Sequence, residues 1–225
     1  MTSRDNILWL QCWRDQQIDF HQQTFNHFLT RFWPGLDMAL GSRVFVPLCG
    51  KSLDMIWLAD QGHQVIGVEL SPVAVGDFFR ENGLKPNRRR VGQFTLWQHG
   101  RISILCGDYF ALKPADLGDI ETVYDRAALT ALPEDIRKHY VSHLRKIIPD
   151  SSQIFLLTTE DAAKNETLSH SLEVGEEITA LYAKNFRIDL AHIESVFELN
   201  PDAPDRPAER AEYKLYRLST NQSAA

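Results

Sequence analysis

The sequence has few cysteines and none of the spacings that commonly hold a metal ion. Its 225 residues include three cysteines, an odd number, and no two of them stand in CxxC spacing. We therefore expect neither a disulfide framework nor a zinc ribbon, and a reducing compartment fits this composition. The eight histidines form no HExxH pattern, so no metal is predicted.

Long apolar runs and an excess of positive charge are also missing. No apolar stretch approaches the roughly 18 residues that a membrane helix needs, and the first six residues are polar, unlike a signal peptide. The net charge of −6 argues against nucleic acid or an anionic membrane as a partner, because both favour a basic surface. We expect a cytoplasmic monomer. The one basic run, residues 88–90 (RRR), is predicted to be a solvated loop, with a role in gating a substrate as the alternative.

From residue 43 onward, short β-rich runs alternate with segments of helical periodicity. Strands are expected at 43–47, 63–69, 102–105, 120–124, 154–158, 188–197 and 213–219, with a hairpin strand at 94–99, and helices at 52–61, 71–82, 133–147 and 172–184. This alternation predicts an α/β fold with a doubly wound, mostly parallel sheet and an antiparallel C-terminal edge. We expect residues 1–225 to form a single domain, with a core over 41–160 and an acceptor-side segment over 161–225.

Aromatic residues gather in the first 40 residues at roughly helical spacing: Trp9, Trp13, Phe20, Phe25, Phe28, Phe32 and Trp33. We predict that Phe25, Phe28 and Phe32 lie on helices packed against the core. Trp9 and Trp13 stand further from the core, ahead of its first strand, so an N-terminal helical segment that covers a ligand is expected there.

Parallel strands place their carboxyl ends at one edge of the sheet, where a ligand binds in doubly wound folds. After the first strand comes PLCGKS, in which Gly50 lets the backbone approach a ligand closely. The tail GKS is that of a phosphate-binding P-loop, but that motif requires a glycine where Phe45 stands. The fingerprint GxGxxG is absent too, so nothing here is suited to a pyrophosphate.

The second strand ends on an acid, Glu69. A carboxylate at this position can accept hydrogen bonds from both hydroxyls of a ribose, as in dinucleotide-binding folds; an ordinary surface acid is the alternative. A ribose-binding acid without a pyrophosphate loop favours S-adenosylmethionine (SAM), a nucleoside with an amino-acid tail and no phosphate, over a nicotinamide cofactor.

The next two strand ends supply further polar candidates. Asp108, after the third strand, could read the adenine edge, with a local Asx-turn as the alternative. Arg126, after the fourth, could bind the SAM carboxylate, orient an anionic acceptor or pair with Asp125. Cys49 and Cys106 lie near the same edge, but no histidine accompanies either, so we expect them to be inert.

Several of these segments resemble the thiopurine S-methyltransferase family. The resemblance rests on residues 9–13 (WLQCW) with 18–21 (IDFH), 43–52 (RVFVPLCGKS), 67–71 (GVELS) and 124–133 (YDRAALTALP). It covers about residues 7–158. After the fifth strand the sequence departs from the family pattern, because the Gly-Pro-Pro-Phe that helps shape the acceptor pocket is missing from 159–170.

The resemblance implies a class I methyltransferase with a seven-stranded Rossmann-like sheet that uses SAM and releases S-adenosyl-L-homocysteine. It implies SAM contacts at Trp13, Leu48, Glu69 and Arg126, and we add Trp9, Phe20, Gly50, Leu70 and Asp108 as expected cofactor contacts. The implied function is methyl transfer to the sulfur of a small aromatic or heterocyclic thiol, for detoxification.

An aromatic thiol arrives largely as thiolate near neutral pH, so we expect no dedicated catalytic base, with Arg126 as the candidate for orienting the acceptor. Three alternatives stay open. The acceptor could be another small molecule, such as a specialised-metabolite thiol, an oxygen or nitrogen nucleophile, or a selenium or tellurium species. The chain could bind SAM without catalysis, or it could be a nicotinamide oxidoreductase, which the missing GxGxxG disfavours.

Overall fold

The computed structural model describes residues 3–18, 21–161, 175–198 and 209–220. The chain falls into two compact units, Met1–Tyr124 with Ser142–Asp150, and Asp125–Val141 with Ser151–Ala225. Strand β6 (Thr122–Arg126) and helix α7 (Glu134–Ile147) each contribute residues to both. The expectation of a single domain stays a prediction.

A mixed sheet with a parallel centre forms the first unit. Its strands lie in the order β3-β4-β5-β2-β1-β6, and β1 pairs in parallel with both β2 and β6, as β2 does with β5. The pairs β3–β4 and β4–β5 are antiparallel. The strand bounds are Arg43–Val46 (β1), Gln64–Glu69 (β2), Asn87–Val91 (β3), Phe94–His99 (β4) and Ile102–Cys106 (β5).

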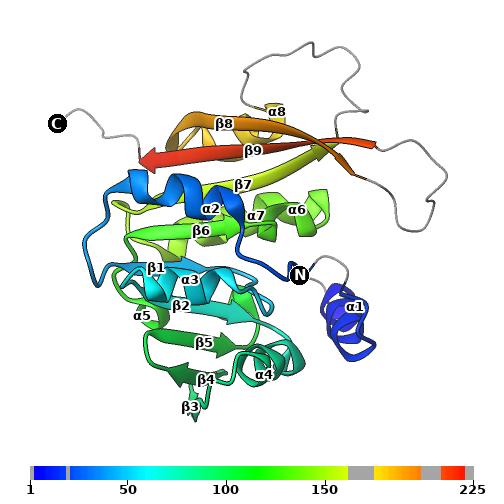
Figure 1. Ribbon diagram of the computed structural model, residues 1–225, viewed down its shortest axis with the longest axis vertical. Helices are drawn as coiled ribbons and strands as arrows, with labels where there is room; N and C mark the ends of the chain where they lie inside the picture. The colour runs from blue at the N-terminus through cyan, green and yellow to red at the C-terminus, as the bar shows by residue number, and fades with distance from the viewer. Residues whose placement is uncertain (1–2, 19–20, 162–174, 199–208, 221–225) are drawn as a thin grey trace. The chain divides into compact units, whose positions relative to one another are not determined.

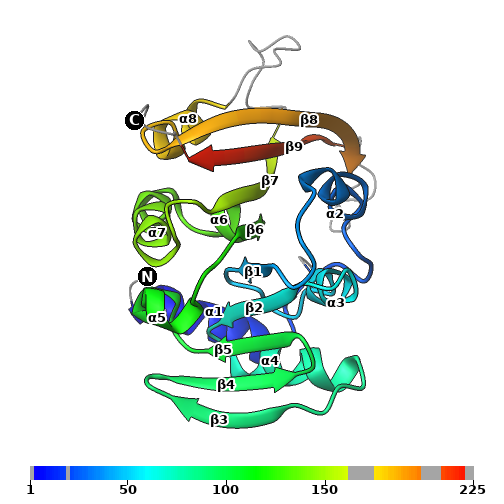
Figure 2. The same cartoon turned by 90° about the vertical axis from the view of Figure 1, so that its left-hand side faces the viewer.

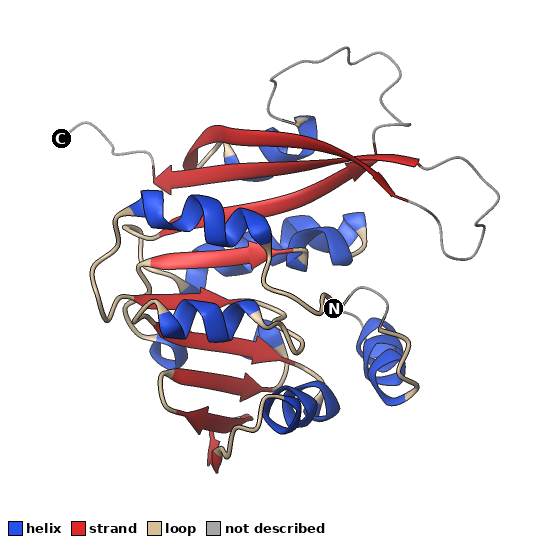
Figure 3. Ribbon diagram, viewed as in Figure 1, coloured by secondary structure: helices blue, strands red, loops and turns tan. Residues whose placement is uncertain are grey.

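Helices cover both faces of this sheet, and α3 and α5 lie on opposite sides of it (Figure 2). The helices that lie wholly within the unit are α1 (Ser3–Arg14), α2 (His27–Phe32), α3 (Asp54–Asp60), α4 (Pro72–Glu81) and α5 (Pro114–Leu117), with 3-10 turns η1 (Trp33–Leu36) and η2 (Tyr109–Ala111). The order along the chain, strand then helix then strand, can be followed by colour in Figure 1, and Figure 3 distinguishes the helices from the strands. It confirms the α/β fold.

Antiparallel strands characterise the second unit. Strand β9 (Glu209–Thr220) pairs with both β7 (Gln153–Asp161) and β8 (Phe186–Glu198). Its helices are α6 (Ala128–Ala131), the first part of α7 and α8 (Glu176–Tyr182). The described residues thus contain nine strands. The sequence predicts eight of them, seven in the sheet and the hairpin strand at 94–99, and does not predict β3.

The arginine run 88–90 belongs to strand β3, so the predicted loop is wrong. Four of the five residues of β3 are exposed, which explains why no alternation of apolar residues marks the strand. Strand β3 is instead held by backbone pairing to β4 and by a cation–π contact, in which the Arg88 guanidinium lies 3.6 Å from the ring centroid of Trp97. An exposed edge strand rich in cations also resists pairing with other sheet edges.

The N-terminal segment is helical, but one of its aromatic residues faces water. Phe28 is buried on α2, as predicted, whereas Phe25 precedes that helix and is 42% exposed, so its predicted packing is wrong. The Asn26 side chain caps α2 by accepting from the backbone N–H groups of Phe28 and Leu29. The cap fixes the backbone at Asn26, and the side chain of the residue before it, Phe25, is left exposed to solvent.

A buried carboxylate holds this segment to the rest of the unit. Asp54 accepts hydrogen bonds from the backbone N–H of Asn26 and from the hydroxyl of Tyr124, both at 2.8 Å. Asp54 belongs to α3 and Tyr124 to β6, so three segments meet at one charge. Buried carboxylates are stable in proteins only when their oxygens are hydrogen-bonded in this way.

Helix α4 follows β2 directly and begins as the sequence predicts. Ser71 accepts from the backbone N–H of Ala74, and Pro72 occupies the first turn, where its missing N–H costs nothing. Phe78 and Phe79 are buried on the next turns. Because two residues, Leu70 and Ser71, separate the end of β2 from the start of α4, the first turn of α4 is fixed beside the carboxyl end of that strand.

Candidate functional site

The loop after β1 has an unusual backbone. Leu48 has a φ of +46° and Gly50 a φ of +52°. A positive φ is uncommon for a leucine and is retained only where the surrounding structure holds it, often at a ligand site. The backbone N–H of Cys49 donates to the carbonyl of Val68 at 3.0 Å, so the loop is joined to β2.

Glu69, the last residue of β2, is held by backbone groups on both sides. The N–H of Gly50 donates to Oε2 at 2.9 Å, and the N–H of Ser71 donates to Oε1 at 2.7 Å. Each carboxylate oxygen keeps a further lone pair after these bonds. The side chain is therefore fixed in orientation and can still accept two hydrogen bonds from a ligand.

The pKa of Glu69 is raised above its usual value, chiefly because burial removes the carboxylate from water. The backbone N–H groups of Ser71, Gly50 and Leu70 lower the pKa in part. Only 7% of the residue is exposed. Amide dipoles, rather than a cation, thus hold this buried charge.

Cys49 and Cys106 both have pKa values raised by burial and by the nearby Glu69. The pKa of Cys106 is raised to about 11, so its thiol is protonated near neutral pH. The Cys49 Sγ lies only 2.7 Å from the position that a Cβ on Gly67 would take, which is too close for a side chain and explains why β2 has a glycine there. Protonated thiols are poor nucleophiles, in agreement with the inert role that we expect for both.

The loop after β5 also reaches the end of β2. The N–H of Gly107 donates to the backbone carbonyl of Glu69 at 2.9 Å, and Leu70 beside it is half-buried. Asp108 accepts from the N–H of Phe110 at 3.0 Å, which is the Asx-turn considered as the alternative to adenine recognition. Contact of Leu70 or Asp108 with SAM stays a prediction.

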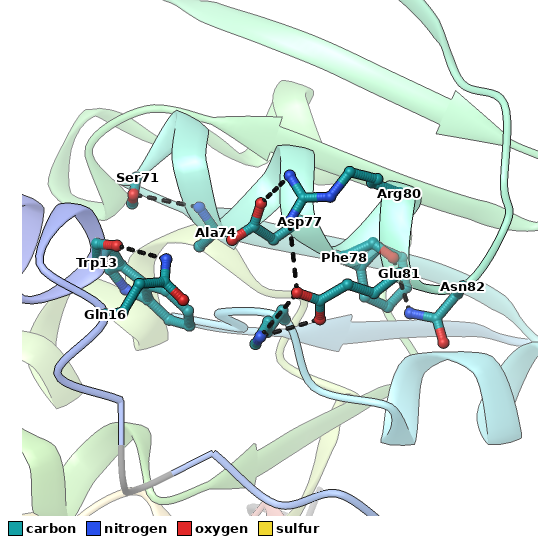
Figure 4. Close-up of polar contacts among 10 residues, drawn as sticks. Trp13, Gln16, Ser71, Ala74, Asp77, Phe78, Arg80, Glu81 and Asn82 are labelled. Atoms are coloured by element: carbon teal, nitrogen blue, oxygen red, sulfur yellow. Dashed lines mark hydrogen bonds and ion pairs between the residues drawn. The ribbon is translucent and has the colours of Figure 1, made fainter.

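One aromatic residue of the N-terminal segment packs beside the β1 loop, and its role as a cover stays a prediction. Trp13, on α1, is 3% exposed, and its ring atom Cζ2 lies 3.0 Å from the position of a Cβ on Gly50. Its carbonyl accepts from the Gln16 side chain, as Figure 4 shows. Trp9 is half-buried on the same helix, and Phe20 lies outside the described residues. The structure thus brings Trp13 to the loop that carries Leu48 and Gly50.

One charged residue of this loop was not among the predicted site residues. The Lys51 ammonium lies 2.9 and 3.1 Å from the two carboxylate oxygens of Glu81, at the end of α4. The lysine of the GKS tail is thus engaged with a carboxylate of the same unit. The partner is 30 residues away, and no periodicity in the sequence marks such a pair.

Arg126 belongs to the second unit, at the end of β6, where it is half-buried. Its predicted role toward the SAM carboxylate or the acceptor stays a prediction.

The residue before Arg126, Asp125, is fully buried and accepts from the Tyr140 hydroxyl at 2.7 Å and from the N–H of Leu129 at 3.3 Å. Burial raises the pKa of Asp125 to about 6, and these hydrogen bonds lower it only in part.

This buried aspartate should make stability depend on pH. The folded pKa of about 6 exceeds the reference value of 3.8, so the folded state binds more protons between these values, and stability should fall as the pH rises from about 4 to about 6. Asp125→Asn should remove roughly 3 kcal/mol of this decline. Urea unfolding of both proteins from pH 4 to pH 8 measures it, with the exposed Asp119→Asn as control; equal slopes for wild type and Asp125→Asn would contradict the assignment.

Within the described residues, no cluster of three or more His, Cys, Asp or Glu side chains is placed to hold a metal ion. No helix in that part of the chain has both the length and the apolar character to span a membrane.

The sequence model of the thiopurine S-methyltransferase family matches residues 4–221. The chain belongs to this family. It is 59% identical over all 225 residues to a thiopurine S-methyltransferase of Stutzerimonas stutzeri, covering 95% of that relative. It is 44% identical over 213 residues, 94% of this chain and 96% of the relative, to a thiopurine S-methyltransferase of Nitrosospira multiformis. The match extends beyond residue 158, where the resemblance in the sequence ended.

Solved structures of low sequence identity share the fold. A SAM-dependent methyltransferase from Anabaena variabilis has a TM-score of 0.62 at 14% identity, covering 96% of this chain and 95% of that one. A Burkholderia thailandensis 1,6-didemethyltoxoflavin-N1-methyltransferase, solved with bound 1,6-didemethyltoxoflavin and S-adenosylhomocysteine, has a TM-score of 0.59 at 13% identity, covering 95% of this chain and 87% of that one. Together with the family match, these findings make the chain a SAM-dependent methyltransferase with a Rossmann-like fold.

Proposed function

We propose that this methyltransferase transfers the methyl group of SAM to the sulfur of a small aromatic or heterocyclic thiol. The observation that carries the proposal is the family match, which spans 4–221 and therefore includes the acceptor-side segment. The relative from Stutzerimonas stutzeri, named for thiopurine S-methylation, matches over the whole chain.

The residues at the end of β2 fit SAM. The Glu69 carboxylate has two fixed oxygens that can accept from the two hydroxyls of a ribose, and burial strengthens such bonds. Leu48 and Gly50 turn the backbone of the β1 loop at the same place. When bound, SAM supplies an electrophilic methyl group on a sulfonium and leaves as the neutral thioether S-adenosyl-L-homocysteine.

Alignment and exclusion of water are the main tasks of the protein in this transfer. The C–S bond to the sulfonium breaks as the thiolate forms its new C–S bond, so charge is neutralised and no strong ionic stabilisation is required. In our proposal Trp13 covers the site beside Gly50, and Arg126 holds the SAM carboxylate or the thiolate. Trp9 and Phe20 extend the aromatic cover.

No general base is assigned. An aromatic thiol reaches the enzyme largely as thiolate near neutral pH, and Cys49 and Cys106 stay protonated, so no enzyme thiolate competes for the methyl group. We further propose that the protein works as a cytoplasmic monomer on free small molecules, in the detoxification of thiols.

A turnover assay with methyl-deuterated SAM, followed by mass spectrometry, tests the acceptor. The panel contains 6-mercaptopurine and thiophenol, with phenols, amines and selenite for comparison. We expect label on thiol sulfur. Label only on oxygen, nitrogen or selenium would replace the thiol by that acceptor, and SAM binding without turnover on any acceptor would indicate a non-catalytic protein.

A further inference from the structure

Lys51 lies in the interior of the first unit, with 7% of its side chain exposed. A buried ammonium is rare in proteins and requires a carboxylate partner, because removing the charge from water is costly. Its partner Glu81 is 42% exposed and accepts through both oxygens, at 2.9 and 3.1 Å. The pair joins the loop after β1 to the last turn of α4.

The two ends of α4 are both connected to the Glu69 carboxylate. At the first end, the N–H of Ser71, the cap residue, donates to Oε1 of Glu69. At the other end, Glu81 binds Lys51, which follows Gly50 in the chain, and the N–H of Gly50 donates to Oε2. These contacts close a circuit through Glu69, Ser71, α4, Glu81, Lys51 and Gly50, which we call the Glu69 frame.

The frame extends along α4 through alternating charges, drawn in Figure 4. Arg80 contacts a Glu81 oxygen at 3.5 Å and an Asp77 oxygen at 2.5 Å. Arg80 is largely exposed, whereas Lys51 is not, so water screens the outer pairs more than the inner one. The Arg80 pairs also lie within α4, so among these contacts it is the Lys51–Glu81 pair that joins the loop to the helix.

We propose that Lys51 is a positioning residue for the methyl transfer. Its ion pair with Glu81 closes the Glu69 frame, fixes the Gly50 N–H and so sets the direction of the carboxylate that receives the ribose. This inference rests on the proposed role of Glu69. A displacement of about 1 Å in such a site can reduce catalysis roughly a hundredfold.

A structural role alone and a positioning role predict different results. Replacing a buried ion pair by apolar residues often leaves stability unchanged, so the double variant Lys51→Met/Glu81→Met should fold. It nevertheless removes the connection between loop and helix. A role in stability predicts normal SAM binding in this variant, whereas positioning predicts weaker binding in a folded protein.

The test measures the Kd for SAM by calorimetry, kcat and KM for SAM, and the melting temperature. We expect Lys51→Met and the double variant to raise the Kd and KM for SAM about tenfold. Lys51→Arg keeps a cation opposite Glu81 and should retain most of the wild-type affinity for SAM. Glu81→Asp keeps both charges but shortens one side chain, so it should raise KM even if Lys51→Met does not fold. Lys85→Met, an exposed lysine after α4, is the matched control and should change nothing.

Folded Lys51→Met and Glu81→Asp proteins with wild-type Kd and KM for SAM would overturn the inference. Glu69→Ala, measured alongside, separates this result from a failure of the proposed function. If Glu69→Ala weakens binding and the Lys51 and Glu81 variants do not, only the positioning role is wrong; if none of these variants weakens it, the site has been misplaced.

Discussion

Glu69→Ala is expected to weaken SAM binding by roughly 1–3 kcal/mol, the range for lost hydrogen bonds to a charged group. The variant removes the two acceptors proposed for the ribose hydroxyls. It also leaves the N–H groups of Gly50 and Ser71 without the oxygens to which they donate. The β1 loop then loses a fixed point, so part of the effect comes from a less ordered site.

Isothermal calorimetry with SAM and with S-adenosyl-L-homocysteine measures this loss. Gln64→Ala is the control, because Gln64 is exposed at the opposite end of the same strand and should not change the affinity. Circular dichroism shows whether the Glu69 variant is folded. Unchanged affinity in a folded Glu69→Ala protein would remove Glu69 from the ribose site.

Glu69 could be found from the sequence because topology alone places it. Parallel strands bring their carboxyl ends together, and a run from 63 to 69 that ends on an acid therefore indicates a position at the ligand edge. The same reasoning located Gly50, which the structure places against that carboxylate. Both inferences depend on strand direction and not on the packing of side chains.

Other features depend on contacts between residues distant in the sequence. The Lys51–Glu81 pair spans 30 residues, and the Asp54–Tyr124 bond spans 70. Neither produces a periodic pattern, and the GKS tail only invited comparison with a phosphate-binding loop, which Phe45 argues against. Strand β3 was missed for a different reason, because a highly exposed edge strand has no apolar face to mark it.

The N-terminal segment was predicted as a cover from its aromatic content, and the sharpest test of that role is its removal. Deleting residues 1–22 is expected to abolish turnover and leave a folded core. The core keeps its anchor, because Asn26, which caps α2 and donates to Asp54, lies beyond the deletion. Turnover is lost because Trp13 no longer covers Gly50, so water enters and the methyl group is no longer aligned.

A point variant separates the ring from the rest of the segment. Trp13→Ala should lower kcat/KM about a hundredfold, and Trp13→Phe, which keeps an aromatic face near the sulfonium, should retain more activity. Leu8→Ala is the matched control on the same helix, because Leu8 is exposed and should be dispensable. Steady-state kinetics with saturating acceptor, alongside thermal unfolding, gives the comparison.

The two variants also distinguish a cover from a binding residue. If Trp13 contributes mainly by excluding water and aligning the methyl group, kcat should fall more than SAM affinity, because these effects act in the transition state. If its ring instead holds the sulfonium in the ground state, the Kd for SAM should rise by the same factor as kcat/KM falls. A truncated enzyme with full activity would contradict both and leave α1 with no part in the transfer.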